Sequence, residues 1–284
     1  MFRHILLPIS SEFYPRQALE RALFIADSIG SAITVMYIIE RKTINQTDKL
    51  SDAYRTTYER EETAEDITEE HKNAADNIVF TDAKNIKTPD LVYEEKVVEG
   101  EYSTMVQHEL SSGDYDLVMM GFQKQCILNY RILDDAAVPV WVEAGGTGSQ
   151  QIIAVCTNLG MNTVVPRISA ELADALGWDL HVLYVVDTED SVQVDTAGER
   201  SKRKPVGDLT DTGERFLDSI DRPRVTTSLV TGSLPKEMAK AARQFNASLV
   251  VVGQQQKKRL LKNLGKSTRR KIAETCEYSV LFVG

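Results

Sequence analysis

The sequence predicts an α/β protein made of two repeated doubly wound domains, each a five-stranded parallel sheet with helices on both faces. Three observations predict this class. The chain contains an internal repeat, its apolar residues alternate between strand-like and helical spacing, and several strand-like runs are almost continuous Val, Ile and Leu. Such continuous runs are typical of parallel strands that are buried on both faces, and right-handed crossovers then place helices on each side.

The first part of the repeat aligns without a gap. HILLPISSEFYPRQALERALFIADSIGSAITVMYIIE, from His4, matches QIIAVCTNLGMNTVVPRISAELADALGWDLHVLYVVD, from Gln151. Each run begins as an apolar strand, passes through a polar turn into apolar residues at helical spacing, ends the helix at a glycine and continues as a second strand. We therefore expect a strand, helix, strand unit at the start of each half.

The second part of the repeat supplies the remaining strands. KVVEGEYSTMVQHELSSGDYDLVMMG, residues 96–121, matches SLVTGSLPKEMAKAARQFNASLVVVG, residues 228–253. Each half then closes with one more β-rich run, at 138–144 and at 279–284. We expect these closing runs to face each other, because an uncovered edge of a parallel sheet invites aggregation.

The linker and the composition fit two domains in one chain. The sequence AGGTGSQ is small, polar and flexible, so we expect domains at 1–146 and 150–284. The 284 residues are 42% hydrophobic, which is enough for two medium cores. No apolar run approaches the roughly 20 residues that span a bilayer, and the N-terminus lacks the pattern of a signal peptide, so we expect a cytoplasmic protein without a membrane partner.

The chain offers no recognisable catalytic or metal-binding motif. Its three cysteines and four histidines are scattered, and none stands at metal-ligand or redox spacing. No nucleophile, base and orienting group can be assembled from motif spacing. We therefore expect neither a metal nor an enzyme.

Several stretches carry a resemblance to a known family. The opening HILLPIS with RQALERALFIADSIGSAITVMYII, the stretch VTGSLPKEMAKAARQFNASLVVVG and the terminal CEYSVLFVG resemble the universal stress protein family. The chain looks like a tandem member, with two UspA-like domains. This resemblance implies a five-stranded parallel sheet per domain, pairing of domains through their last strands, and, in many members, binding of ATP or AMP.

The family's nucleotide-binding pattern is incomplete in the second half. Nucleotide-binding members carry an aspartate after the first strand and, after the fourth, Gly-x-x-Gly, nine residues, then Gly-Ser or Gly-Thr. Glycines let phosphates approach the backbone, and a following helix N-terminus offers free N–H groups. Here Thr157 replaces the aspartate, and Gly253 and Ser267 match. Gln256 and Lys266 replace the other two glycines.

A one-residue slip of the loop would restore part of this pattern. Gly265 lies one residue early, so the slip would leave Ser267 and Thr268 as hydroxyl donors. The resemblance then places the adenine near Val185 and the phosphates near Gly253, Gly265, Ser267 and Thr268. We expect weak affinity, since the backbone has lost glycines.

The first half departs further from the pattern. Ser10 stands at the aspartate position, and the stretch from Gly121 to Pro139 is about nine residues shorter than in the family, by comparison with the family's glycine spacing. We expect no nucleotide there.

A basic run in the second half leaves alternatives open. It is either a solvated loop or a set of side chains that attract phosphate in place of the lost glycines. A larger polyanion such as RNA is not expected, because the run lacks aromatic residues that stack on bases. The run consists of Lys257, Lys258, Arg259, Lys262, Lys266, Arg269, Arg270 and Lys271.

Together these features predict a cytoplasmic stress-response binding or signalling module with at most one weak adenine-nucleotide site, for ATP or AMP, in the C-terminal domain. The alternative is a structural adaptor that binds no nucleotide and recruits a protein partner through its surfaces. A weak ATP hydrolase would need a carboxylate or metal ligand near the phosphates, and Thr157 argues against it. A homodimer is among the oligomeric states that the sequence leaves open.

Overall fold

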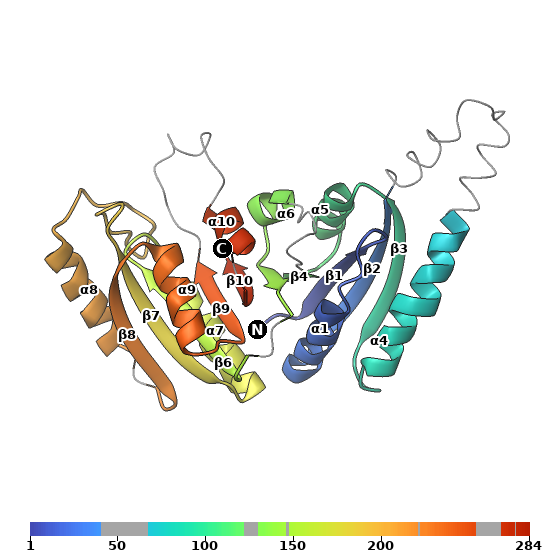
Figure 1. Ribbon diagram of the computed structural model, residues 1–284, viewed down its shortest axis with the longest axis horizontal. Helices are drawn as coiled ribbons and strands as arrows, with labels where there is room; N and C mark the ends of the chain where they lie inside the picture. The colour runs from blue at the N-terminus through green and yellow to red at the C-terminus, as the bar shows by residue number, and fades with distance from the viewer. Residues whose placement is uncertain (41–67, 122–129, 146–147, 221, 254–267, 276) are drawn as a thin grey trace, which may run out of the picture. The chain divides into compact units, whose positions relative to one another are not determined.

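The computed structural model describes most of the chain as two compact units (Figure 1). The first unit is Phe2–Ala136, and the second is Ala137–Gly284 together with Met1. The described residues are 1–40, 68–121, 130–145, 148–220, 222–253, 268–275 and 277–284.

The first unit contains four parallel strands in the order β3-β2-β1-β4. Helices connect them, which gives the predicted alternation of strands and helices. The elements are β1 (His4–Ser10), α1 (Arg16–Ile29), β2 (Ala32–Glu40), the π-helix η1 (Ala75–Phe80), α4 (Thr81–Ile86), β3 (Tyr93–Gly100), α5 (Tyr102–Ser112), β4 (Leu117–Gly121) and α6 (Tyr130–Asp135).

The second unit contains five parallel strands in the order β10-β9-β6-β7-β8. Its elements are β5 (Val140–Glu143), β6 (Gln151–Thr157), α7 (Val164–Leu176), β7 (Asp179–Asp187), α8 (Val206–Asp218), β8 (Val225–Gly232), α9 (Leu234–Gln244), β9 (Leu249–Gly253), α10 (Thr268–Thr275) and β10 (Ser279–Val283). The α/β class with doubly wound repeats is therefore confirmed.

Strand β5 follows the first half in sequence but packs with the second unit. It pairs antiparallel with β10, and the register places Leu281 opposite Trp141. The expectation that the two closing runs face each other is confirmed. The pairing covers the edge of the parallel sheet that β10 would otherwise leave open.

The same local signals form the first helix of each repeat. Gly30 and Gly177 follow α1 and α7 in the left-handed conformation, with φ of +69° and +66°. Glycine adopts this conformation without the steric cost that a Cβ would add, so it ends both helices where the repeat predicts. Every residue from Ile152 to Thr157 of β6 is buried, as expected for a central parallel strand.

The strand order places the candidate site. In the second unit the chain runs from β6 outward to β7 and β8, then returns to β9 on the other side of β6. Ligands of doubly wound sheets bind beyond the carboxyl ends of the strands where this order reverses. The ends of β6, β7 and β9 therefore form the candidate binding edge of the second unit. None of the described helices is long and apolar enough to cross a membrane.

Candidate functional site

The strand-end edge of the second unit begins with Val185, the residue predicted to lie beside an adenine. Val185 is fully buried in β7, and its register neighbours are Thr157 of β6 and Val230 of β8. It lies two residues before Asp187, where the strand ends. The polar groups next to Val185 therefore decide what can bind at this end of the sheet.

Thr157, which stands at the family's aspartate position, is bound by the turn that follows it. The backbone N–H of Thr157 donates to Oδ1 of Asn162 at 3.0 Å, and Nδ2 of Asn162 donates back to the carbonyl of Thr157 at 3.0 Å. The hydroxyl of Thr157 accepts a hydrogen bond from the N–H of Leu159 at 3.4 Å. Both backbone groups of Thr157 thus have partners within the chain.

Asn158 makes the most extensive contacts of this edge. Its side chain is almost completely buried, at 1% exposure for the residue. Its Oδ1 accepts from the N–H of Asp187 at 2.7 Å, and its Nδ2 donates to the carbonyl of the same residue at 3.4 Å. A carboxamide presents an acceptor beside a donor, as an edge of adenine does. Asn158 therefore occupies the backbone groups at the end of β7 that an adenine could read.

The same amide holds the loop between β7 and α8, residues 188–205 (the β7–α8 loop). Nδ2 of Asn158 donates to the carbonyls of Asp190 at 3.3 Å and Val192 at 2.6 Å. The N–H of Val194 donates to the backbone carbonyl of Asn158 at 2.8 Å. The loop consequently returns from the end of β7 to the end of β6.

Further contacts fix the β7–α8 loop on itself. Arg200 forms an ion pair with Asp190 at 2.6 Å, and the N–H of Ser201 donates to the carbonyl of Gln193 at 2.9 Å. Val192, a residue of this loop, is buried. Hydrogen bonds and apolar burial together make this loop an ordered part of the unit.

Asp187 closes the start of helix α9. Its Oδ2 accepts from the N–H of Leu234, the first residue of α9, at 3.1 Å, and its Oδ1 accepts from the N–H of Glu189 at 2.9 Å. A carboxylate is favoured beside a helix N-terminus, because the free N–H groups and the helix dipole attract negative charge. The chain's own carboxylate thus takes the place that an anionic ligand would favour.

Comparisons with known proteins identify the family of this chain. The model of the universal stress protein family matches residues 1–140 and again residues 151–284. The chain belongs to the universal stress protein family. No curated protein sequence matches it.

Solved structures agree on the fold of this universal stress protein. A universal stress protein from Archaeoglobus fulgidus DSM 4304 is 14% identical, with a TM-score of 0.62 over 99% of this chain and 95% of that one. A functionally unknown protein from Pseudomonas aeruginosa PAO1 is 14% identical, with a TM-score of 0.63 over 99% and 92%. The cytoplasmic domain of a prokaryotic cation chloride cotransporter is 12% identical, with a TM-score of 0.54 over 99% and 95%. These low identities show the fold alone.

Gly253, the first glycine of the predicted phosphate loop, ends β9 against helix α7. A Cβ at this position would lie 2.9 Å from Cγ2 of Val165. Gly121 ends β4 in the first unit, where a Cβ would lie 2.1 Å from Cβ of Pro15. A neighbouring side chain thus approaches the glycine closely at both strand ends of this universal stress protein.

Of the other predicted phosphate contacts, only Thr268 lies among the described residues. Gly265 and Ser267 lie outside the described residues, as do Lys257, Lys258, Arg259, Lys262 and Lys266 of the basic run. Thr268 is the first residue of α10. The predicted phosphate site of this family member stays a prediction.

The first unit arranges the corresponding strand ends with different residues. Oγ of Ser11, which follows β1, accepts from the N–H of Glu40 at the end of β2, at 3.0 Å. Oγ of Ser10 donates to Oε1 of Glu40 at 3.5 Å. Glu101 precedes α5 and accepts from the N–H of Thr104 at 2.8 Å. Burial alone would raise the pKa of Glu101, but hydrogen bonds from Thr104 and its neighbour Ser103 lower that pKa to about 2.

Among the described residues, the buried thiol and imidazole of the second unit are not arranged as catalytic groups. Burial raises the pKa of the Cys156 thiol, so it behaves as a buried thiol of the sheet rather than as a nucleophile. Burial lowers the pKa of His181, and its two ring nitrogens bond the hydroxyls of Thr226 and Ser228, each at 2.8 Å. Among the described residues, no group of His, Cys, Asp and Glu could hold a metal ion.

The contacts of Asn158 had no clear signal in the sequence. A polar residue directly after the first strand was visible, but its partners lie about 30 residues further along, in a loop without periodic pattern. The one usable signal is the length of the segment between β7 and α8, since long connections in doubly wound folds often lie over the strand ends.

Proposed function

We propose that this universal stress protein is a cytoplasmic stress-response binding or signalling module that holds adenine nucleotide at most weakly, in its C-terminal domain. The observation that carries this proposal is the pair of hydrogen bonds between the amide of Asn158 and the backbone of Asp187. The groups at the end of β7 that could read an adenine are bonded within the chain.

The cost of displacing these contacts sets the expected affinity. An adenine beside Val185 would have to move Asn158 from Asp187 and loosen the β7–α8 loop. Each buried polar group left without a partner costs about 1–3 kcal/mol. A loss of about 1.4 kcal/mol already weakens a dissociation constant tenfold. Two such groups would weaken ATP binding by a factor of about thirty or more.

If ATP or AMP binds, the phosphates lie near Gly253, Gly265, Ser267 and Thr268 and depend on the basic side chains of the same loop. Charge-based contacts of this kind are screened by salt over about 8–10 Å at physiological ionic strength. Calorimetric titration of the full chain with ATP, at low salt and at physiological salt, tests this. The proposal expects weak binding that falls steeply with salt, and salt-independent tight binding would overturn it.

A second candidate function is the structural adaptor, which recruits a protein partner and binds no nucleotide. The observation that favours it is that the first unit also satisfies its strand-end N–H from within, through Ser11 and Glu40. In this case the surfaces of the two domains would serve for recognition of the partner. Absence of any ATP signal at low salt would favour the adaptor over the weak nucleotide site.

A further inference from the structure

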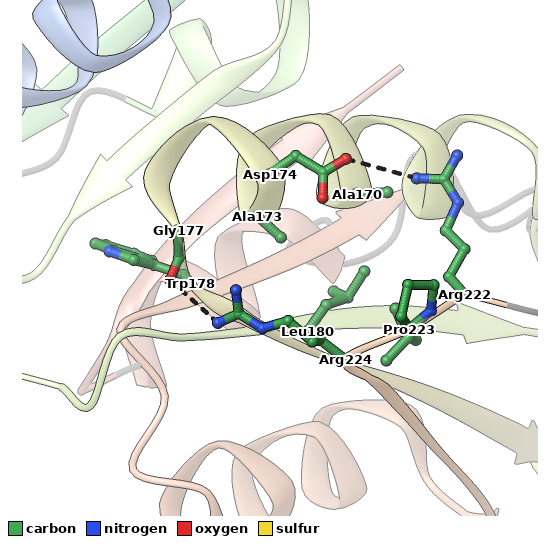
Figure 2. A pocket seen from close by; sticks show the side chains of 10 residues that line it. Ala170, Ala173, Asp174, Gly177, Trp178, Leu180, Arg222, Pro223 and Arg224 are labelled. Atoms are coloured by element: carbon green, nitrogen blue, oxygen red, sulfur yellow. Dashed lines mark hydrogen bonds and ion pairs between the residues drawn. The ribbon is translucent and has the colours of Figure 1, made fainter.

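A cavity of about 400 Å³ lies at the opposite end of the second unit, beside the starts of β7 and β8 and the last turns of α7 (Figure 2). This volume is in the range of small-molecule sites. The strand-end edge discussed above is not part of it. Its apolar wall consists of Ala170, Ala173, Trp178, Leu180, Pro223 and Val225.

Two arginines, Arg222 and Arg224, line the same cavity. Figure 2 shows Arg222 directed to Asp174 on α7, at 3.9 Å, and Arg224 reaching toward the end of that helix. Nη2 of Arg224 contacts the carboxylate of Asp179 at 3.0 Å and the carbonyl of Gly177 at 3.5 Å. Both ion pairs are solvent-exposed, and such pairs contribute little, so a ligand can compete with them.

The first unit shows how the cavity arises, because the repeat aligns the two places residue by residue. Leu180 of β7 pairs with Val225 of β8. In the first unit Ile33 of β2 pairs with Tyr93 of β3. Val225 and Tyr93 are thus equivalent, and the residues before them can be compared directly.

Two positions of the cavity wall carry smaller side chains than the first unit, whereas Trp178 replaces the smaller Ser31. Ala170 stands where the first unit has Leu23, and Pro223 stands where it has Leu91. Both leucines are buried, at 2% and 8% exposure. Neither leucine side chain is present in the cavity wall of the second unit, where Ala170 and Leu180 are themselves buried, at 5% and 4% exposure.

The second unit also carries more positive charge at these positions than the first unit. Arg222 and Arg224 replace Asp90 and Val92 of the first unit. Arg224 has a φ of +64°, in the left-handed region that side chains other than glycine rarely adopt. Such a conformation persists only where the surroundings enforce it, often at ligand sites. Here it directs the guanidinium along the cavity wall.

We propose that this cavity binds a small organic acid with an apolar body. The body would lie on Ala170, Ala173 and Leu180, and the acidic group would be held by the guanidinium of Arg224. Guanidinium groups match carboxylates in geometry and charge, and the contacts of Arg224 to Asp179 and Gly177 use Nη2 alone.

Phenylacetate is a suitable probe, because it combines one carboxylate with an apolar ring. Acetate supplies the charge without the body, and 2-phenylethanol supplies the body without the charge. Binding to the full chain is followed by calorimetry and by emission of Trp178, with the buried Trp141 as a constant background. We expect saturable binding of phenylacetate and much weaker binding of both controls.

Three variants locate the site. Arg224→Asn removes the charge with a residue that tolerates a positive φ, and it should weaken phenylacetate about tenfold or more. Ala170→Leu restores the leucine of the first unit and should abolish binding. Arg167→Gln removes a charge from α7 outside the cavity and should change nothing.

Other outcomes would overturn the proposal. These are no saturable signal with phenylacetate, equal affinity for 2-phenylethanol, or parental affinity in the Arg224→Asn variant. Circular dichroism and melting temperature control for folding. If Ala170→Leu fails to fold, the Arg224→Asn result decides alone.

Discussion

The two domains end their second strand with a carboxylate but satisfy the backbone around it differently. In the first domain the hydroxyl of Ser11 accepts from the N–H of Glu40. In the second, the amide of Asn158 accepts from the N–H of Asp187, and its two N–H donors are shared among three carbonyls. A carboxamide has two donors where a hydroxyl has one. The single side chain of Asn158 thus bonds the backbone at the end of β7 and also holds the β7–α8 loop.

The largest expected effect comes from removing this amide. Asn158→Ala leaves the N–H of Asp187 and the carbonyl of Val192 without buried partners, so we expect a loss of about 2–4 kcal/mol in unfolding free energy. Hydrogen exchange should increase in the β7–α8 loop. The matched variant Ser11→Ala removes one acceptor and should cost about 1 kcal/mol. Equal losses in urea unfolding would contradict the comparison.

The strand-end glycines give the next largest effect. Gly121→Ala places a methyl group against Pro15, whose ring cannot easily move, and Gly253→Ala places one against the end of the Val165 side chain. Overpacking of this kind costs about 1–3 kcal/mol. We expect Gly121→Ala near the upper end and Gly253→Ala near the lower, as measured by melting temperature. The reverse order would contradict this comparison of the two packing sites.

Removal of a helix cap should change the unfolding free energy by a smaller amount, and differently in the two domains. Glu101 caps α5 through its side chain, whereas Ser233 before α9 makes no such bond. Glu101→Ala should therefore cost about 1 kcal/mol at pH 7, and Ser233→Ala only a few tenths. Because the folded pKa of Glu101 is lowered to about 2, its contribution is present above the unfolded pKa and is lost as pH falls toward 2. Urea unfolding at pH 7 and pH 3 measures both effects, and a variant whose deficit does not shrink at pH 3 would contradict this role.

The smallest effect is the pH dependence that His181 adds to the second domain. Burial lowers its folded pKa, so the unfolded state takes up a proton more readily. Stability is then fully present above the unfolded value near 6.5 and falls as pH drops through that value. Replacing His181 by Gln should flatten the unfolding free energy between pH 7 and pH 5. An unchanged slope would assign the dependence to other groups.

Much of the fold could be predicted from the sequence, because its signals are local or repeated. Continuous apolar runs marked β6 and β9, and Gly30 and Gly177 marked the helix ends. The pairing of β5 with β10 followed from the need to cover a sheet edge. These features depend on patterns that a single sequence displays.

The candidate site was less predictable, because its decisive contacts join distant residues. Asn158 meets Val192 across 34 positions, and no periodicity indicates that approach. Gly253 was interpreted through a phosphate loop, yet a Cβ there would also come close to the side chain of Val165. The cavity near Ala170 becomes visible only when the two repeats are compared in register.

The most direct test of the closed strand-end edge is the nucleotide content of the purified full-length protein. The protein is denatured, and the released small molecules are identified by ultraviolet absorbance and mass analysis. Because Asn158 and the β7–α8 loop occupy the end of β7, we expect no ATP or AMP to be retained through purification. Recovery of either nucleotide at one equivalent per chain would contradict the account.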